Sequence, residues 1–198
     1  MIAPLSVLHN WQREAVTFAP DLCLILLADA PDLQLAKVGP NDVVVASWDR
    51  MVRRSEELNG LRWQTVVLDE AQAMKNAVTK RAQAAFALNA EFRIALTGTP
   101  VENRTSELWS LMRAAVPGLL FGSWDEFRDR FAGPIERDGD PWARQSLARL
   151  VRPFLLRRLK RDVAPELPAR TEIELEVVLS APERTLLRGS PPVGSAKH

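Results

Sequence analysis

The sequence of 198 residues predicts an α/β protein: a parallel sheet with flanking helices, followed by a mainly helical appendage. Two observations carry this prediction. Short apolar runs alternate with helical patterns through the first hundred residues, which is typical of sheets built from β-α-β units. Two of these runs also stop directly before polar residues, and ligands bind outside the carboxyl ends of the strands in such sheets.

The expected strands are apolar runs without polar interruption, as in sheets that helices cover on both faces. The first residues have the pattern of the end of a strand. The other strands are expected at Leu22–Leu27, Val43–Ala46, Val66–Leu68 and Ile94–Leu96. Cys23 lies in one of these runs, and we expect its side chain to be packed.

The expected helices show apolar residues at helical spacing. In the first hundred residues they begin at Ser6, whose hydroxyl can cap the first turn, and at Met51 and Val78. After Pro100 the pattern is helical, and Ser123-x-x-Glu126 is a capping box. Further helices are expected at Glu107–Val116, after Ser123 and at Trp142–Leu150, with a loop at Gly133–Pro141, a half-exposed strand at Glu172–Leu179 and a disordered tail from Arg188.

Composition excludes several classes of protein. The hydrophobic content of 46% is enough for a core, and the net charge of +1 gives no overall attraction to nucleic acid or membrane. The single cysteine excludes a disulfide framework and favours a reducing compartment. The longest apolar run is too short to span a bilayer. We therefore expect a soluble intracellular protein, cytoplasmic or associated with the nucleoid, with no membrane partner.

Two polar segments at strand ends carry the candidate chemistry. Asp69 and Glu70 follow the strand at Val66–Leu68, where one carboxylate could hold Mg²⁺ through its waters and the other could orient or deprotonate a water. Thr97, Gly98 and Thr99 follow the next strand, where their hydroxyl and amide groups could sense a terminal phosphate. Each segment also has a structural reading, since acidic residues suit the first turn of a helix and Thr-Gly-Thr-Pro makes a turn. Together, on strands one helix apart, they favour function.

In this context the sequence resembles the first motor lobe of the SNF2 family of DNA-dependent ATPases, within helicase superfamily two. Asp69-Glu70-Ala71-Gln72, with Lys75-Asn76 behind it, is similar to motif II, and Leu96-Thr97-Gly98-Thr99-Pro100 to motif III. The resemblance extends from about residue 1 to 187. The other matching segments are residues 3–11 (motif Ia), 107–111, 127–135, 153–163 and 167–172.

The resemblance implies an incomplete RecA-like lobe at residues 1–116. It implies the family's helical insertion at residues 117–187, ahead of a second lobe, and leaves 188–198 as the tail. By the same analogy Asp69 takes the metal, Glu70 the water, and Gln72, Thr97, Gly98 and Thr99 contact ATP. The partner implied is double-stranded DNA, bound without sequence specificity because phosphate contacts carry no base information. The implied DNA-binding residues are Ser6, Asn10, Trp11, Ser47, Arg157 and Arg158.

The sequence departs from the family at the phosphate cradle. No Gly-x-x-x-x-Gly-Lys-Ser/Thr is present, and we expect the strand that carries it to belong before Ile2, in the middle of the sheet. The second lobe and its arginine finger are expected after Leu187. A truncated or frame-shifted motor, inactive alone and with unpaired apolar edges, is therefore expected.

A non-catalytic module for DNA binding or for protein interaction is the alternative. From Trp142 to Arg161 there is no acidic residue and the stretch is rich in arginine. Such a stretch could contact phosphates, or it could be a solvated helix face with arginines lying over apolar neighbours. The pattern leaves both open.

Overall fold

The computed structural model describes residues 1–30, 33–98 and 105–158. The chain divides into two compact units, Met1–Leu155 and Leu156–His198, and everything below concerns the first unless stated. The strand expected at Glu172–Leu179, the tail from Arg188, and Thr99 lie outside the described residues. The predicted boundary after residue 116 falls within the first unit and stays a prediction.

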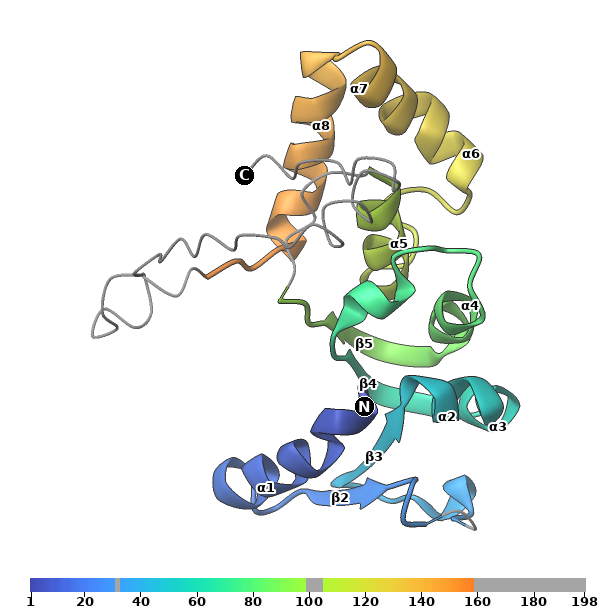
Figure 1. Ribbon diagram of the computed structural model, residues 1–198, viewed down its shortest axis with the longest axis vertical. Coiled ribbons are helices and arrows are strands. Elements are labelled where there is room, and N and C mark those ends of the chain that lie inside the picture. Colours follow the sequence, from blue (N-terminus) through green and yellow to red (C-terminus); the bar gives the residue numbers. More distant parts are fainter. Residues whose placement is uncertain (31–32, 99–104, 159–198) are drawn as a thin grey trace, which may run out of the picture. The chain divides into compact units, whose positions relative to one another are not determined.

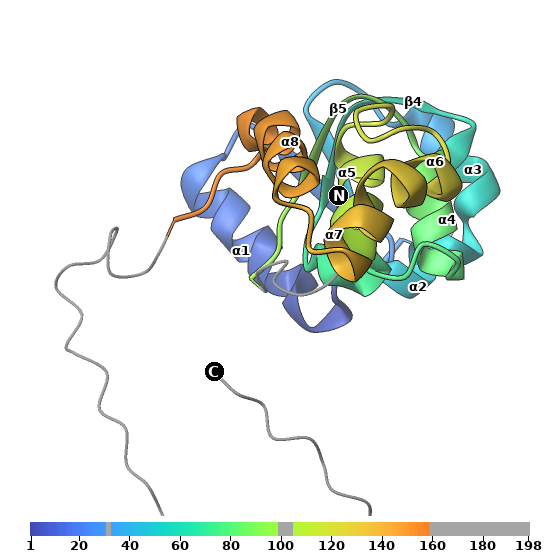
Figure 2. The same cartoon turned by 90° about the horizontal axis from the view of Figure 1, so that it is seen from above.

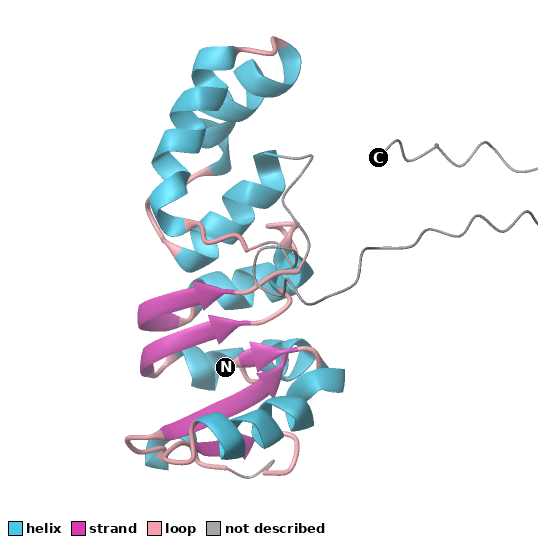
Figure 3. Cartoon of the chain, turned by 90° about the vertical axis from the view of Figure 1, so that its left-hand side faces the viewer, coloured by secondary structure: helices cyan, strands magenta, loops and turns pink. Residues whose placement is uncertain are grey.

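A five-stranded parallel sheet organises the first unit, which confirms the predicted fold class (Figure 3). Its order is β2-β3-β1-β4-β5 and every neighbouring pair is parallel. The strands are β1 (Ile2–Ala3), β2 (Cys23–Leu26), β3 (Asp42–Ser47), β4 (Arg62–Leu68) and β5 (Asn89–Ala95).

Helices connect these strands and form the region after them (Figure 1). The α-helices are α1 (Leu8–Phe18), α2 (Trp48–Arg53), α3 (Ser55–Asn59), α4 (Lys80–Ala87), α5 (Thr105–Ala115), α6 (Trp124–Phe127), α7 (Gly133–Arg137) and α8 (Pro141–Val151). Short turns complete the fold: η1 (Leu5–Val7), η2 (Leu35–Lys37), η3 (Ala71–Met74), the π-helical η4 (Arg128–Ala132) and η5 (Arg152–Phe154). No helix in the described ranges has the length and apolar character needed to cross a membrane.

The two faces of the sheet bury different side chains because successive strand residues point to opposite sides. On β3, Val44 and Ala46 pack into the cluster that α2 and α4 cover, whereas Val45 packs with Leu8 of α1. The helices accordingly lie on opposite sides of the strands in the view of Figure 2. Beyond the reach of α1, the face of β4 and β5 is open: the register partners Thr65 and Phe92 are exposed, Phe92 by 60%.

Helix α5 joins the sheet to the helical region, because it contributes to both cores. Leu111 and Ala114 belong to the cluster beneath the sheet, while Trp109 and Met112 belong to an aromatic cluster with Phe127. The predicted cap at Ser123 is confirmed, since its hydroxyl accepts the amide of Glu126 at 3.3 Å. Phe127 and Phe131 are buried as predicted, and Trp124 is partly buried.

Three predictions about local structure are wrong. Ser6 caps no helix: it lies in η1, and α1 begins at Leu8 without a side-chain cap. Residues 133–137 form α7 rather than a loop, because Pro134 occupies a first-turn position, where its missing N–H costs nothing. Val78 is 82% exposed and precedes α4, which Thr79 caps by accepting the amide of Ala82.

The strand predictions need two further corrections. Cys23 is exposed and β2 is only partly buried, because β2 is the edge strand of the sheet. The expected gap in the middle of the sheet is absent from the described strands, since β1 pairs with both β3 and β4. The Met1 amino group donates to the carbonyl of Val44 at 2.6 Å, and burial lowers its pKa to about 5.

Arg93 ties β5 to the two helices beside it. Its guanidinium donates to the carbonyls of Ala114 (3.2 Å) and Leu88, and burial lowers its pKa. We expect Arg93→Met to lower the free energy of unfolding by about 2 kcal/mol, since charged hydrogen bonds are lost and buried carbonyls lose their donor. Urea denaturation measures this change.

The matched control is Arg62→Met. Arg62 forms a 3.1 Å ion pair with Glu91 on the same two strands, but both side chains are exposed. Exposed pairs contribute at most about 1 kcal/mol, so this variant should unfold at nearly the same urea concentration as the wild-type chain. Equal losses in the two variants would contradict the role given to Arg93.

Candidate functional site

Four strands end at one edge of the sheet, and their exits carry most of the predicted site residues. Ala3 is level with Ser47, and Leu68 is level with both Ile2 and Ala95. Because the pairs are parallel, the chain leaves β1, β3, β4 and β5 on the same side. Asp69 and Thr97, 28 residues apart in sequence, therefore emerge from neighbouring strands, which confirms the adjacency that the motor assignment requires.

Hydrogen bonds on all sides fix Asp69. Its amide donates to the carbonyl of Ile2 at 2.8 Å, and its carbonyl accepts the indole N–H of Trp48 at 3.1 Å. In its carboxylate, Oδ1 accepts the amide of Glu70 at 2.9 Å and Oδ2 accepts the indole Nε1–H of Trp11 at 2.8 Å. Each oxygen keeps acceptor capacity, so the carboxylate can still hold a hydrated metal ion.

Glu70 follows in a left-handed backbone conformation, with φ of 49°. This region is uncommon for a residue with a long side chain and costs roughly 1–2 kcal/mol. Glu70 Oε2 accepts the side-chain amide of Gln72, and Oε1 has no hydrogen-bond partner within the described ranges. The strained turn thus presents one free carboxylate oxygen beside Asp69.

Gln72 connects the two predicted segments. Its amide group donates to Glu70, and its Oε1 accepts the hydroxyl of Thr97 at 2.9 Å. The backbones are joined as well, because Ala71 donates to the carbonyl of Leu96 and Leu96 donates to that of Leu68, both at 2.8 Å. A displacement at Thr97 is therefore felt at Glu70 through a single side chain.

Gly98 has an exposed, unrestricted position. An added Cβ would meet nothing within 4 Å, and its φ is outside the left-handed region. The protein itself therefore gives no reason for glycine here, and close approach of a ligand remains a prediction. Thr99 follows outside the described residues.

Two of the predicted DNA-binding residues on α1 and η1 are exposed. Ser6 and Asn10 are both accessible, and Asn10 accepts a hydrogen bond from Arg13 at 3.1 Å. Ser47 has a structural role, since it caps α2 by accepting the amide of Arg50 at 3.2 Å. Trp11 points its indole N–H to Asp69, a contact that the sequence did not suggest. Arg157 and Arg158 are exposed in the second unit.

The basic stretch lies partly on α8, where its arginines are exposed. Arg144, Arg149 and Arg152 have no carboxylate partner within the described part of the chain. A solvated face and a phosphate contact both require this exposure, so the two readings stay open.

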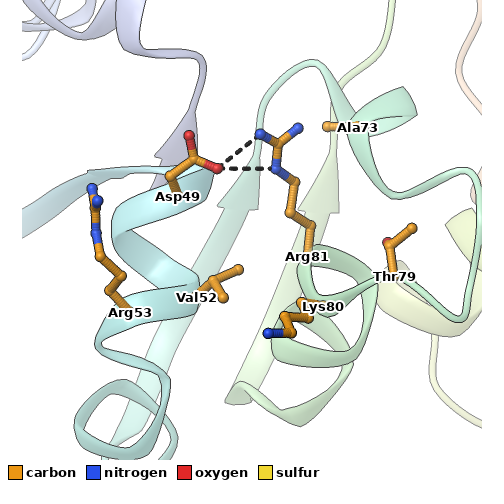
Figure 4. A pocket seen from close by; sticks show the side chains of 7 residues that line it. All are labelled: Asp49, Val52, Arg53, Ala73, Thr79, Lys80 and Arg81. Carbon is orange, nitrogen blue, oxygen red and sulfur yellow. Dashed lines mark hydrogen bonds and ion pairs between the residues drawn. The ribbon is translucent and has the colours of Figure 1, made fainter.

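A cavity of about 510 Å³ lies between α2 and the start of α4 (Figure 4). Arg81 reaches across it, with Nη2 at 2.8 Å and Nε at 3.2 Å from Oδ1 of Asp49. Arg53 and Lys80 add positive charge to its lining, and none of the predicted site residues contributes to it. The sequence reasoning missed both this cavity and Trp48, which it had treated as an ordinary core residue.

A known family accounts for this arrangement. The SNF2-related domain matches residues 1–188. The chain belongs to the SNF2-related family. Its five-stranded sheet with flanking helices is the fold of the SNF2 ATPase core, and it covers part of that core.

The SNF2-related chain resembles proteins of bacteria, fungi and archaea. YwqA of Bacillus subtilis (strain 168), named as a candidate ATP-dependent helicase/translocase, is 45% identical over 94% of this chain and 21% of its own length. The chromatin-remodeling ATPase INO80 of Cryptococcus neoformans var. neoformans serotype D (strain B-3501A) is 33% identical, over 95% and 12%. The SWI2/SNF2 ATPase core of Sulfolobus solfataricus, solved in complex with dsDNA, is 41% identical with a TM-score of 0.70, over 82% and 34%.

The SNF2-related chain thus spans about a fifth or less of the length of these two curated relatives. What the relatives do as whole proteins enters below only as a proposal. Within the described residues no group of three or more His, Cys, Asp or Glu side chains could hold a metal ion, so any metal at Asp69 would keep most of its waters.

The bridge from Thr97 to Gln72 can be tested by Thr97→Val, which removes the hydroxyl but keeps the shape. The loss of one hydrogen bond, about 1 kcal/mol, should speed local opening roughly fivefold. Amide hydrogen exchange at Ala71, which bonds to Leu96, measures this. Thr65→Val, at an exposed position of β4, is the control and should leave that exchange unchanged; the same acceleration in both variants would exclude the bridge.

Proposed function

We propose that this chain supplies the carboxylate side of the ATP site, and part of the DNA-binding surface, of an SNF2-type double-stranded DNA translocase. The observation that carries the proposal is the hydrogen-bonded connection from Asp69 and Glu70 through Gln72 to Thr97. These residues resemble motifs II and III and meet at one edge of a parallel sheet. The SNF2 core solved with dsDNA, at 41% identity, supports DNA as the partner.

In this proposal each residue at the edge has a distinct role. Asp69 holds Mg²⁺ through water, and the metal when bound would neutralise charge on the outer phosphates of ATP. Glu70, with Oε1 free, orients a water molecule and accepts its proton. Gln72 keeps the Glu70 carboxylate in place and reports the position of Thr97. Gly98 and Thr99 face the nucleotide.

The DNA contacts in this proposal come from exposed residues. Ser6 and Asn10 lie beyond the end of β1, Ser47 ends β3, and Arg157 and Arg158 follow α8. Hydroxyl, amide and guanidinium groups bind phosphate oxygens without reading bases. A protein partner, an intracellular location near the nucleoid, and the alternative of a non-catalytic interaction module stay predictions.

We expect the 198-residue chain by itself to have no useful ATPase activity. Its sequence holds no Gly-x-x-x-x-Gly-Lys segment, and removing even one preorganised donor costs roughly 10²–10³ in rate, whereas an arginine finger contributes about 10³–10⁵. A single-turnover assay with Mg-ATP and duplex DNA tests this, with Glu70→Gln as the background. Turnover equal to that of an intact motor, and lost in Glu70→Gln, would contradict the expectation.

Binding to duplex DNA should weaken steeply with salt and should be equal for unrelated sequences. Replacing Arg157 and Arg158 together by Ala should reduce the slope of log K against log salt by about 2, since each phosphate contact contributes roughly 0.9. Fluorescence anisotropy with a labelled duplex at several salt concentrations measures the slope.

The control removes the same charge elsewhere. Arg62 and Arg128 are exposed and paired with Glu91 and Asp125, so their double replacement by Ala should keep the wild-type slope. If both double variants changed the slope equally, net charge rather than contact would explain binding. A wild-type slope near zero would reject DNA as the partner.

A further inference from the structure

Trp11 is the only side chain that donates to the carboxylate of Asp69 within the described residues. It lies on α1, is half-buried, and packs beside Leu8, Leu26 and Val45 on the face of the sheet that α1 covers. Its Nε1–H meets Oδ2 of Asp69 at 2.8 Å, across 58 residues of sequence. The other carboxylate oxygen is bonded within the turn itself, by the amide of Glu70.

The chemistry of this contact favours a role beyond packing. Indole is a pure donor on a rigid ring, so it can hold a carboxylate in one orientation without competing for a metal ion. Hydrogen bonds to ionised groups are short and strong. A residue that served only to fill the space beneath α1 would need no N–H aimed at a carboxylate.

Trp48 provides an internal comparison. It also donates its indole N–H to Asp69, but to the backbone carbonyl, at 3.1 Å. Trp48 therefore fixes where the strand ends, whereas Trp11 fixes how the carboxylate is turned. The two tryptophans contact the same residue and differ in which of its groups they hold.

We propose that Trp11 is a positioning residue for Asp69: its indole N–H holds the carboxylate in the orientation that binds a divalent cation. This inference rests on the proposed function of Asp69 as a metal ligand. Groups outside the ligand shell that orient metal-binding carboxylates typically change metal affinity 10–100-fold when removed. The motif that the resemblance linked to DNA would then also serve the metal.

The test uses the full chain labelled with ¹⁵N, and Mn²⁺ alone as a paramagnetic stand-in for Mg²⁺. The six tryptophans give separate indole signals, which single Trp→Phe variants assign. In the wild-type chain Mn²⁺ should broaden the signals of Trp11 and Trp48 first. The signal of Trp142, which is 75% exposed on α8, should broaden last.

Trp11→Phe should weaken Mn²⁺ binding roughly tenfold, as followed by the Trp48 signal. Trp48→Phe, followed by the Trp11 signal, should leave the affinity nearly unchanged. Wild-type affinity in Trp11→Phe, with the Trp48 signal still broadened, would overturn the proposal. If Mn²⁺ broadened neither signal in the wild-type chain, the metal site at Asp69 itself would be wrong, which is a separate failure.

A second measurement does not depend on whether Trp11→Phe folds. Asp69→Ala removes the acceptor, so the indole proton of Trp11 should move upfield while the signals of Trp109 and Trp124 stay in place. An unchanged Trp11 signal would show that its N–H is not bonded to this carboxylate, and would reject the proposal.

Discussion

The parallel register of β1 with its two neighbours is the constraint on which the site depends. Ile2 and Ala3 pair with Ala46 and Ser47 on one side, and Ile2 with Leu68 on the other. The amide of Asp69 completes this register by donating to Ile2. A shift by one residue would turn Leu68 out of the core and direct Asp69 away from Trp11.

Around this register the molecule places strain and support together. Glu70 adopts a left-handed conformation that no glycine relieves, directly after a residue held by four hydrogen bonds, from or to Ile2, Trp48, Trp11 and Glu70. Such strain persists where the surrounding structure over-determines the backbone, and it is typical of functional sites. Here it turns one carboxylate toward the protein and leaves an oxygen of the next one free.

The helical region is bound to the same framework. Helix α5 contributes Leu111 to the core under the sheet and Trp109 to the aromatic cluster, and Arg93 joins β5 to its last turn. The segment that carries Thr97 therefore lies between two rigid elements, β5 and α5. A nucleotide-dependent movement at Thr97 would act on Gln72 rather than on the sheet.

The sequence by itself determined the parallel α/β fold, the neighbouring exits of Asp69 and Thr97, the cap at Ser123 and the SNF2-related family, because periodicity, turn residues and motif order are local signals. Only the tertiary structure decided that Trp11 holds a carboxylate, that Trp48 holds the same residue by its carbonyl, that Cys23 lies on an edge and that residues 133–137 form a helix. These depend on strand order and on contacts between residues far apart in the chain. An apolar pattern shows that an indole ring is buried, but it does not show which acceptor its N–H will reach.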